Sequence, residues 1–410
     1  MQTQLADFIR DTREGQEADT ILRKCVHCGF CTATCPTYQL LGDELDGPRG
    51  RIYLIKQVLE GAEPTARTQL HLDRCLTCRS CESTCPSGVE YGRLVDIGRH
   101  VVSQRVPRKG RDRLMRWALK EFVPRAGVFG AAMKLGRMVR GVLPAALKEK
   151  VPEARPAGAW PAPRHTRRVI ALAGCVQPAM APSINAAAAR VLDAIGISMV
   201  EQPGAGCCGA LRQHLDEHEG ARADARRNID AWWPAVARGE VEAIVMTASG
   251  CGVQVRDYGH LLADDPAYAE KAARISALTR DIGEIVAAEH DVLVQVLGKR
   301  GSAGKLAFHS PCTLQHGQKI RGVVESILTA AGYELVPVRD SHLCCGSAGT
   351  YSLLQPELSH RLRENKLAAL TEHGAPAIAS ANIGCITHLD PAASVPVRHW
   401  IEYVDERLAS

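Results

Sequence analysis

In the stretch Cys25-Val-His-Cys28-Gly-Phe-Cys31-Thr-Ala-Thr-Cys35-Pro36, four cysteines follow one another with gaps of two, two and three residues, and a proline follows the last. The same gaps and the same proline return fifty residues later in Cys75-Leu-Thr-Cys78-Arg-Ser-Cys81-Glu-Ser-Thr-Cys85-Pro86. Three cysteines at steps of three let the backbone wrap round one metal cluster, while the rigid proline aims the fourth cysteine away from it. The two runs therefore predict two adjacent clusters.

This spacing is typical of bacterial two-cluster ferredoxins, in which the fourth cysteine of each run ligates the other cluster. We expect two [4Fe-4S] clusters, one held by Cys25, Cys28, Cys31 and Cys85 and the other by Cys75, Cys78, Cys81 and Cys35. A structural zinc site needs only four thiolates, so eight in two identical runs argue against zinc. His27, inside the first run, is expected to pack or tune rather than ligate.

The segments between and after the cysteine runs have helical spacing. Ile52, Ile55, Val58 and Leu59 recur at intervals of three and four, with Pro48 ahead of them and a glycine after them. Residues 94–102 repeat this pattern. We therefore expect residues 1–104 to form an α-helical ferredoxin domain.

The length and the cysteine content limit the possible classes of protein. A chain of 410 residues can build several cores, so its 16 cysteines are not needed as staples. The first fifteen residues are charged throughout, and Lys or Arg interrupts every later apolar stretch before a membrane span is reached. A cytoplasmic location is expected, where thiols stay reduced and clustered cysteines indicate metal or redox chemistry rather than disulfides.

Residues 105–168 are strongly basic. They contain 17 Lys and Arg against 4 Asp and Glu, a balance of +13 in a chain whose net charge is +5. Seven prolines break the segment into short amphipathic pieces, including residues 111–120 and 131–142. We expect a helical linker that docks on an acidic partner or on the inner membrane surface, or that is simply a solvated connector. Few aromatic residues and no known nucleic-acid fold argue against nucleic acid.

From residue 169 onward the chain repeats itself. Cys175 and Cys312 lie 137 residues apart, as do the Cys-Cys-Gly triplets that begin at Cys207 and Cys344, and Cys251 and Cys385 lie 134 apart. In each unit short apolar runs alternate with helical segments, which predicts a mostly parallel sheet. The expected lobes are residues 169–300 and 301–410. The fold class expected is α + α/β, with the cysteines gathered beyond the carboxyl ends of the strands.

The second group of eight cysteines resembles the cysteine-rich CCG domain of heterodisulfide reductase subunits and of iron-sulfur subunits of flavin dehydrogenases. It is predicted to form a redox or metal site, although buried structural thiols are the plain alternative. In heterodisulfide reductases each set has a fifth cysteine and holds a noncubane cluster, but Gln254 and His388 occupy those positions here. His309, His316, His342 and His388 are interpreted singly as structural. The eight cysteines are Cys175, Cys207, Cys208, Cys251, Cys312, Cys344, Cys345 and Cys385.

Nearly the whole chain resembles the iron-sulfur subunits of glycolate oxidase, also called glycolate dehydrogenase. The resemblance is carried by the first cysteine run and its continuation Thr-Tyr-Gln-Leu-Leu-Gly-Asp-Glu-Leu-Asp-Gly-Pro-Arg-Gly-Arg, residues 37–51. It implies that flavin-bearing partner subunits oxidise glycolate to glyoxylate, and that this chain carries the electrons to an acceptor such as quinone. Iron-sulfur subunits of lactate or glycerol-3-phosphate dehydrogenases share these modules and remain alternatives.

Outside the Cys-Cys-Gly segments the sequence contains no Gly-rich dinucleotide fingerprint, and it contains no G-x-S-x-G nucleophile motif. The chain is therefore not expected to oxidise glycolate alone. Two other classes stay open: a thiol or disulfide reductase that works at the CCG cysteines, and a structural subunit. Two clusters in one domain favour conduction over a purely structural role.

Overall fold

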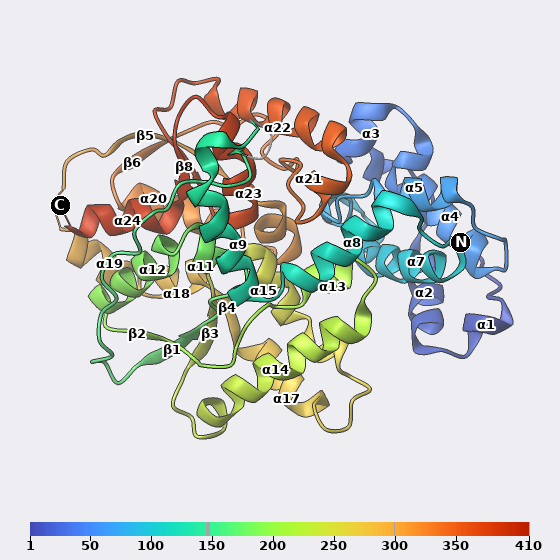
Figure 1. The fold of residues 1–410 in the computed structure, drawn as a ribbon, viewed down its shortest axis with the longest axis horizontal. Helices are drawn as coiled ribbons and strands as arrows, with labels where there is room; N and C mark the ends of the chain where they lie inside the picture. The colour runs from blue at the N-terminus through green and yellow to red at the C-terminus, as the bar shows by residue number, and fades with distance from the viewer. Residues whose placement is uncertain (145–147, 299, 410) are drawn as a thin grey trace.

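The helical domain lies beside two α/β lobes, and two further helices cross the surface between them (Figure 1). The computed structural model describes residues 1–144, 148–298 and 300–409. In this view the helical domain, in blue, lies at the right, the first lobe below and the second lobe, in orange and red, above. The expected class, a helical domain followed by α/β units with parallel sheets, is confirmed.

The N-terminal domain is built from helices with two short 3-10 turns, Phe30–Thr32 and Glu44–Asp46. Pro48 occupies the first turn of α4, where its missing N–H costs nothing, and Ile52, Ile55 and Leu59 point into the core. The helices are α1 (Asp7–Arg10), α2 (Arg13–Lys24), α3 (Pro36–Leu41), α4 (Pro48–Leu59), α5 (Ala66–Asp73), α6 (Ser80–Thr84) and α7 (Tyr91–Arg105).

Helices α4 and α7 approach most closely at a glycine. A Cβ atom at Gly98 would lie 2.6 Å from Cγ1 of Ile55, so any larger residue would separate the two helices. Between these helices lies the core of the domain, which also contains Ile21, Leu22 and Leu94. The two cysteine runs occupy the loops between these helices, together with the 3-10 turn Phe30–Thr32 and the short α6.

Each lobe contains a four-stranded parallel sheet with the same strand order. The first sheet runs β2-β1-β3-β4 and the second β6-β5-β7-β8. In each sheet the last edge strand was not expected from the sequence, because each has only three residues, Thr-Arg-Asp and Val-Arg-His, most of which are polar and give little periodicity. The strands are β1 (Arg168–Ala171), β2 (Ser198–Glu201), β3 (Ala243–Met246), β4 (Thr279–Asp281), β5 (Gly304–His309), β6 (Tyr333–Val336), β7 (Ile378–Ser380) and β8 (Val397–His399).

Helices cover the faces of both sheets. In the first lobe these are α11 (Gln177–Met180), α12 (Ser183–Ala194), α13 (Ala210–His214), α14 (His218–Ala237), α15 (Ser249–Arg256), α16 (Tyr258–Leu261), α17 (Ala269–Leu278), α18 (Ile282–Ala288) and α19 (His290–Leu297). In the second lobe they are α20 (Val323–Ala330), α21 (Tyr351–Leu354), α22 (Pro356–Thr371), α23 (Ile383–Leu389) and α24 (Trp400–Ala409), with a π-helical turn at Thr313–Gly317 and a 3-10 turn at Asp390–Ala392.

The two lobes share one hydrophobic core. Helix α12 of the first lobe packs on α24 of the second, and one cluster of buried residues spans both sheets. Arg190 on α12 forms an ion pair with Asp405 on α24 at 2.6 Å. At the sheet ends, a ring nitrogen of His399 lies 2.8 Å from the Thr247 carbonyl oxygen. The lobes are therefore held in a fixed relation.

The basic segment forms α8 (Gly110–Phe122), α9 (Ala126–Met138) and a 3-10 turn at Arg140–Val142, and residues 152–167 lead to β1 without helix or strand. Arg108 and Arg116 pair with Asp73 of the helical domain, and Lys120 pairs with Glu217 of the first lobe. Part of the segment's charge thus fastens the domains together. Among the described residues, no helix combines the length and apolarity needed to cross a bilayer.

Candidate redox site

The first three cysteines of the first run share a cavity with the last cysteine of the second. Cys25, Cys28, Cys31 and Cys85 line it, together with residues that include Ile52 and Tyr91. Cys28 is exposed, whereas Cys25 is buried. Val26 and Phe30 beside it are 69% and 61% exposed. This cavity therefore opens at the surface of the helical domain.

A second cavity is lined by the other cysteines of the two runs. Cys35, Cys75, Cys78 and Cys81 line it, with Arg51 and Arg79 among their neighbours. Cys81 also lines the first cavity, so the two sites lie side by side. The distribution of the eight thiols between the cavities is compatible with the crossed ligand sets, which remain a prediction.

The loops of the two runs have the same backbone form. Left-handed φ angles occur at matching positions, His27 (56°) and Thr77 (52°), and again at Gly29 (87°) and Arg79 (59°). Residues other than glycine adopt this region at a cost of roughly 1 kcal/mol or more, and such strain concentrates at functional sites. The repeated strain indicates that both loops are shaped to wrap a bound group.

The thiols fit a group that brings positive charge. Burial, followed by the neighbouring Cys25, raises the pKa of the Cys31 thiol to about 11. Burial likewise raises the pKa values of the Cys78 and Cys81 thiols well above the ordinary range. Crowded thiols of this kind do not ionise unaided, and bound metal ions remove that obstacle by stabilising thiolates. The residues present therefore suit iron-sulfur clusters.

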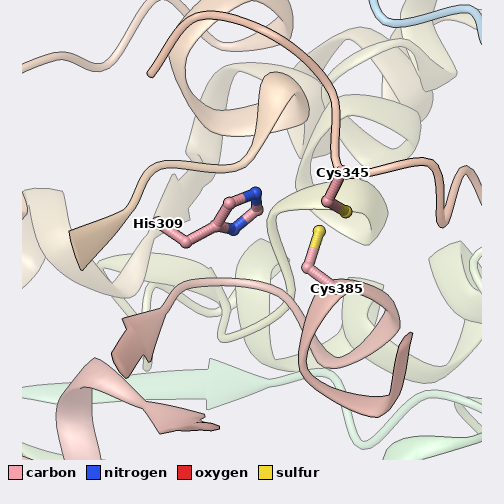
Figure 2. Close-up of side chains that lie close together, drawn as sticks. All are labelled: His309, Cys345 and Cys385. Atoms are coloured by element: carbon pink, nitrogen blue, oxygen red, sulfur yellow. The ribbon is translucent and has the colours of Figure 1, made fainter. Parts of the chain in front are cut away.

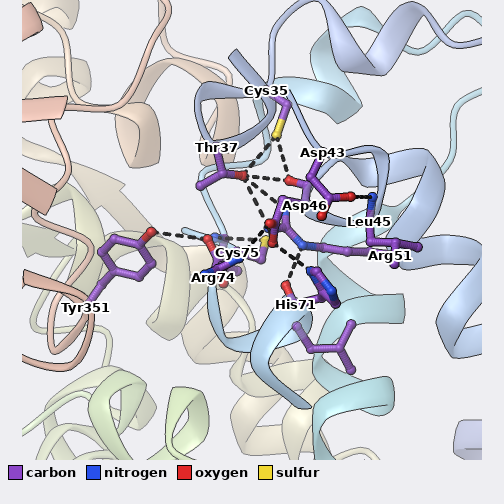
Figure 3. Close-up of polar contacts among 12 residues, drawn as sticks. Cys35, Thr37, Asp43, Leu45, Asp46, Arg51, His71, Arg74, Cys75 and Tyr351 are labelled. Carbon is purple, nitrogen blue, oxygen red and sulfur yellow. Dashed lines mark hydrogen bonds and ion pairs between the residues drawn. The ribbon is translucent and has the colours of Figure 1, made fainter. Parts of the chain in front are cut away.

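Buried ionic groups surround the second cavity (Figure 3). Arg51 donates from Nε to the His71 carbonyl at 2.7 Å, and its Nη2 lies 3.5 Å from the Asp46 carboxylate. Asp46 also accepts from Arg74 at 2.8 Å. The Cys35 sulfur lies 3.3 Å from the Thr37 hydroxyl, which is itself 3.2 Å from Arg51. This network connects a predicted cluster ligand to a fixed guanidinium.

Two guanidinium groups are buried next to the second run. Burial opposes the charge of Arg51, yet Tyr91, Cys75, Cys35 and Asp46 raise its pKa above the ordinary value. Arg99 is buried as well, and its Nη2 donates to the Cys75 carbonyl at 2.6 Å. Arg49, near the first run, is partly exposed and pairs with Glu44. The second cavity is therefore the more electropositive.

A larger cavity of about 520 Å³ lies where the helical domain and both lobes meet. Cysteines of all three parts line it, and the lobe cysteines follow the carboxyl ends of β1, β2 and β3 in the first lobe and of β5, β6 and β7 in the second. The sequence-predicted positions are thus brought together, except that Cys345 lies behind the wall. The lining thiols are Cys75, Cys78, Cys175, Cys207, Cys208, Cys251, Cys312, Cys344 and Cys385.

Within each lobe the thiols contact one another in a matched order. The first-lobe order is Cys175, Cys207, Cys208, Cys251, and the second-lobe order is Cys312, Cys344, Cys345, Cys385. The sulfurs of Cys312 and Cys344 are 3.9 Å apart.

The thiols of the two lobes differ in how readily they ionise. Contacts with Cys175 and Cys208, then the Gly209 N–H and Arg227, lower the pKa of the Cys207 thiol. In the second lobe, contact with Cys312 lowers the pKa of the equivalent thiol of Cys344, but contact with Cys345 and burial raise it well above the ordinary range. Cys207 is therefore the thiolate-prone member of its lobe.

The Cys-Cys-Gly turns require their glycines. Gly209 and Gly346 have φ angles of 90° and 89°, and each N–H lies 3.5 Å from the sulfur of the first cysteine of its triplet. A Cβ atom at Gly346 would meet the Ser359 carbonyl oxygen at 2.6 Å. Only glycine combines this dihedral angle with this approach, so the turn holds both sulfurs in place.

The cysteines of the helical domain reach those of the second lobe. Cys78, Cys312 and Cys344 belong to one packed cluster with Leu76 and Tyr351. The Tyr351 hydroxyl donates to the Arg74 carbonyl at 3.2 Å, which ties the second lobe to the second cysteine run. The thiols therefore form a nearly continuous succession from the surface to the central cavity.

The four histidines near the second set have different positions. His316 lies between the Ser83 hydroxyl and the His342 carbonyl, both at 2.9 Å, and so joins two domains. His388 lies 3.3 Å from the Ser359 hydroxyl. Only His309 lies with its ring beside lobe thiols in a compact His-Cys-Cys group, within the part of the chain that the structure describes.

Sequence reasoning missed Arg51, Asp46 and Arg99, although Asp46 and Arg51 lie in the stretch that carries the family resemblance. A charged residue on an apolar helix face was the available signal, since Arg51 lies four residues before Ile55 and seven before Val58 and so shares their face of α4.

Comparison with known families identifies the two kinds of domain. Residues 21–89 match the 4Fe-4S dicluster domain. Residues 169–256 and 306–390 each match the cysteine-rich domain named CCG. The fold and site thus define an iron-sulfur protein in which a dicluster ferredoxin domain is joined to a duplicated cysteine-rich domain.

Similar proteins show to which family within this class the chain belongs. The chain is 55% identical to the glycolate oxidase iron-sulfur subunit of Escherichia coli over 410 residues, which are 100% of this chain and 99% of that protein. It is 32% identical to a probable glycolate oxidase iron-sulfur subunit of Bacillus subtilis, covering 90% of this chain and 88% of that protein. Lactate utilization protein A of Exiguobacterium is 26% identical over 52% of this chain and 85% of its own length. The chain belongs to the family of glycolate oxidase iron-sulfur subunits.

Proposed function

We propose that this chain is the electron-transfer subunit of a glycolate dehydrogenase, and that it passes electrons from flavin-bearing partner subunits on to an acceptor such as quinone. The observation that carries the proposal is the succession of cysteines from the exposed Cys28, through Cys78, to Cys312 and Cys344 at the central cavity. The full-length match to a glycolate oxidase subunit supports the substrate. The clusters supply one-electron carriers when bound.

The first cysteine run is the proposed entry point. Its loop is exposed at Cys28 and presents the apolar side chains of Val26 and Phe30 to solvent. Exposed apolar groups round a redox site favour contact with a partner protein. The flavin-bearing subunits are proposed to dock here and to oxidise glycolate to glyoxylate, because hydride chemistry belongs to a cofactor for which this chain has no sequence motif.

Buried positive charge supports a direction for electron transfer through this chain. At the second run three guanidinium groups, those of Arg51, Arg74 and Arg99, accompany the one buried carboxylate of Asp46, whereas Arg49 near the first run is partly exposed and paired with Glu44. Positive charge in a low-dielectric interior stabilises an added electron more than exposed charge does. The second run is therefore proposed as the more readily reduced station, from which electrons go toward the second lobe.

The lobe cysteines are proposed as the exit station. They line a cavity of about 520 Å³, a volume that admits a small organic acceptor. Cys344, Cys345 and Cys385 of the second lobe are all buried. A disulfide substrate is the second candidate for this place, because the Cys312 and Cys344 sulfurs are only 3.9 Å apart.

The decisive experiment uses the full chain, purified without oxygen, with and without the partner subunits encoded beside it. Glycolate should reduce the iron-sulfur signals, followed by low-temperature EPR, only when the partners are present. Lactate, glycerol 3-phosphate and a disulfide serve as competing substrates. Glycolate oxidation by the chain alone, or preferential reduction by lactate, would overturn the proposal.

Peripheral attachment to the inner membrane is proposed for the surface of α8, α9 and the turn after them. Here basic residues accompany exposed apolar ones, with Trp117 51% exposed, Leu135 59%, Met138 76% and Val142 85%. Such segments bind anionic lipid surfaces because the basic residues are attracted to the lipid charge and the apolar side chains enter the lipid interface.

A further inference from the structure

His309 occupies the carboxyl end of β5, directly ahead of the second-lobe cysteines. Its Nδ1 lies 2.9 Å from the hydroxyl of Ser380, its register partner on β7. Its side chain is buried, and Nε2 has no hydrogen-bond partner among the described residues. The ring is thus held from one side, with one buried nitrogen left over.

The leftover nitrogen faces sulfur. A ring nitrogen of His309 and the sulfurs of Cys345 and Cys385 all lie within 4.8 Å of one another, and all three residues are buried. Figure 2 shows the imidazole and the two thiols pointing toward one another from three separate segments of the second lobe. Since Nδ1 is bonded to Ser380, the nitrogen available to this group is Nε2.

The first lobe has no counterpart to this group. By the 137-residue repeat, Leu172 takes the place of His309, and by the 134-residue repeat Met246 takes the place of Ser380. Leu172, Met246 and Cys208 belong to one apolar cluster. Both lobes therefore contain the thiols, whereas the imidazole and its hydroxyl partner occur together in the second lobe.

An unpartnered imidazole nitrogen is costly inside a protein. Burying such a group without a hydrogen bond is unfavourable, and most buried polar groups in native structures have a partner. An apolar residue fits the same place in the first lobe, so packing alone does not require the histidine. A ligand that accepts the nitrogen lone pair would remove the cost.

We propose that His309, Cys345 and Cys385 bind one divalent metal ion of the zinc class. Zinc takes imidazole nitrogen and thiolate sulfur at about 2.0 to 2.3 Å in tetrahedral geometry, which places ligand atoms roughly 3.3 to 3.8 Å apart. The observed group needs only a small contraction to reach this. Ser380 plays the part usual for a group that orients a metal-binding histidine through its other nitrogen.

The charge of the surroundings suits two thiolates. The buried Lys366 donates from Nζ to the Asp340 carbonyl at 2.7 Å, and its charge faces Cys345 and Cys344. A divalent ion with two thiolates is neutral, so the ammonium is balanced once a further lobe thiol ionises. Three protein ligands leave one coordination position open, which Cys344 or a water molecule can fill.

The site deepens the proposed role of the second lobe without depending on the substrate of the complex. It makes the two lobes chemically unequal, because only the second lobe carries the His-Cys-Cys group. The experiment below counts metal rather than turnover, so it can fail while electron transfer from glycolate stands.

Metal analysis of the full-length, anaerobically purified chain tests the proposal. We expect about one zinc per chain beside about eight iron atoms, and an X-ray absorption spectrum with nitrogen and sulfur neighbours at zinc. After chelation, Co²⁺ alone should restore one equivalent with thiolate absorption bands. No zinc together with no Co²⁺ uptake, or iron in place of zinc at this site, would overturn the proposal.

Variants separate ligation from folding. His309→Leu copies the first lobe and should lose the zinc while keeping the iron, and His309→Cys should keep it. Ser380→Ala should weaken Co²⁺ binding by roughly tenfold or more. Cys251→Ser, the first-lobe equivalent of Cys385, is the matched control and should leave zinc unchanged. Zinc content unaltered in folded His309→Leu would refute the assignment.

Discussion

Cys78 and Cys312 pack in one buried cluster across the boundary between the helical domain and the second lobe, although 234 residues separate them in the chain. This contact joins the two groups of cysteines that the sequence presents as separate motifs. Each lies at the wall of the central cavity. The contact makes the second lobe the shorter route out of the helical domain.

The first prediction concerns this junction. Cys312→Ser should leave the cluster EPR signals and their reduction by glycolate intact, because neither predicted ligand set contains Cys312. Turnover with the natural acceptor should fall at least about tenfold, which corresponds to about 1.4 kcal/mol of barrier. Steady-state assays with partner subunits measure this, and Cys175→Ser in the first lobe is the control. Unchanged turnover in Cys312→Ser would remove the second lobe from the route.

The crossed ligand sets give a second prediction. Cys35→Ser should alter the EPR signal that Cys78→Ser alters, since both residues line the second cavity. Cys85→Ser should instead match Cys28→Ser, because these two line the first cavity. If each fourth cysteine affects the cluster of its own run, the crossing is wrong.

Buried charge at the second run leads to a third prediction. Arg51→Gln should lower the potential of the cluster at Cys75 and Cys78. A unit charge about 7 Å away at an effective dielectric constant near 20 is worth about 2 kcal/mol, or roughly 100 mV. EPR-monitored redox titration measures the shift.

Arg51→Lys is the control for this experiment, since it retains the charge and should shift the potential less. Arg51→Gln should also reduce stability, because Asp46 is completely buried and loses part of its compensation. Equal potentials in both variants would show that the charge does not tune the cluster.

The surface of α9 and the following turn provides a fourth prediction. Met138→Ser with Val142→Ser should weaken binding to anionic vesicles by about tenfold or more, because two exposed apolar side chains leave the lipid interface. Co-sedimentation across a salt series measures this, and binding should also fall as salt screens the basic residues. Val292→Ser, at an exposed apolar site on α19, is the control. Binding that is insensitive to both salt and these substitutions would point away from lipid.

The fifth prediction is a pH dependence of stability. Burial raises the pKa of Asp281, at the start of α18, to about 7. The folded protein therefore holds a proton that the unfolded chain has released between about pH 4 and pH 7, so stability falls as the pH rises through this window. Asp281→Asn keeps the acceptor that caps Gly283 N at 2.9 Å and should remove this loss. Thermal unfolding of the variant and parent should differ more at pH 8 than at pH 5, because only part of the loss has occurred at pH 5; equal differences at both would contradict the shift.

Local pattern predicted most of the elements correctly. The spacing of Ile52, Ile55 and Val58 predicted α4, and the short apolar runs of the repeat predicted strands such as β1, because neighbouring residues alone show the apolar face of a helix or a buried strand. The edge strands β4 and β8 were missed because three residues give too short a period. The shared core of α12 and α24 was also missed, since pairing between distant helices leaves no local signal.

The sequence by itself determined the chemistry that each segment offers: two ferredoxin-type cysteine runs, two matched lobes, and glycines where the Cys-Cys turns need positive φ. Those properties depend on spacing of a few residues, which the chain displays directly. Only the tertiary structure decided which groups meet. It placed Arg51 against the second run, Cys78 beside Cys312, and the unpartnered nitrogen of His309 beside Cys345 and Cys385. Such contacts join residues tens to hundreds of positions apart, and they arise from burying shared apolar surface rather than from any local repeat.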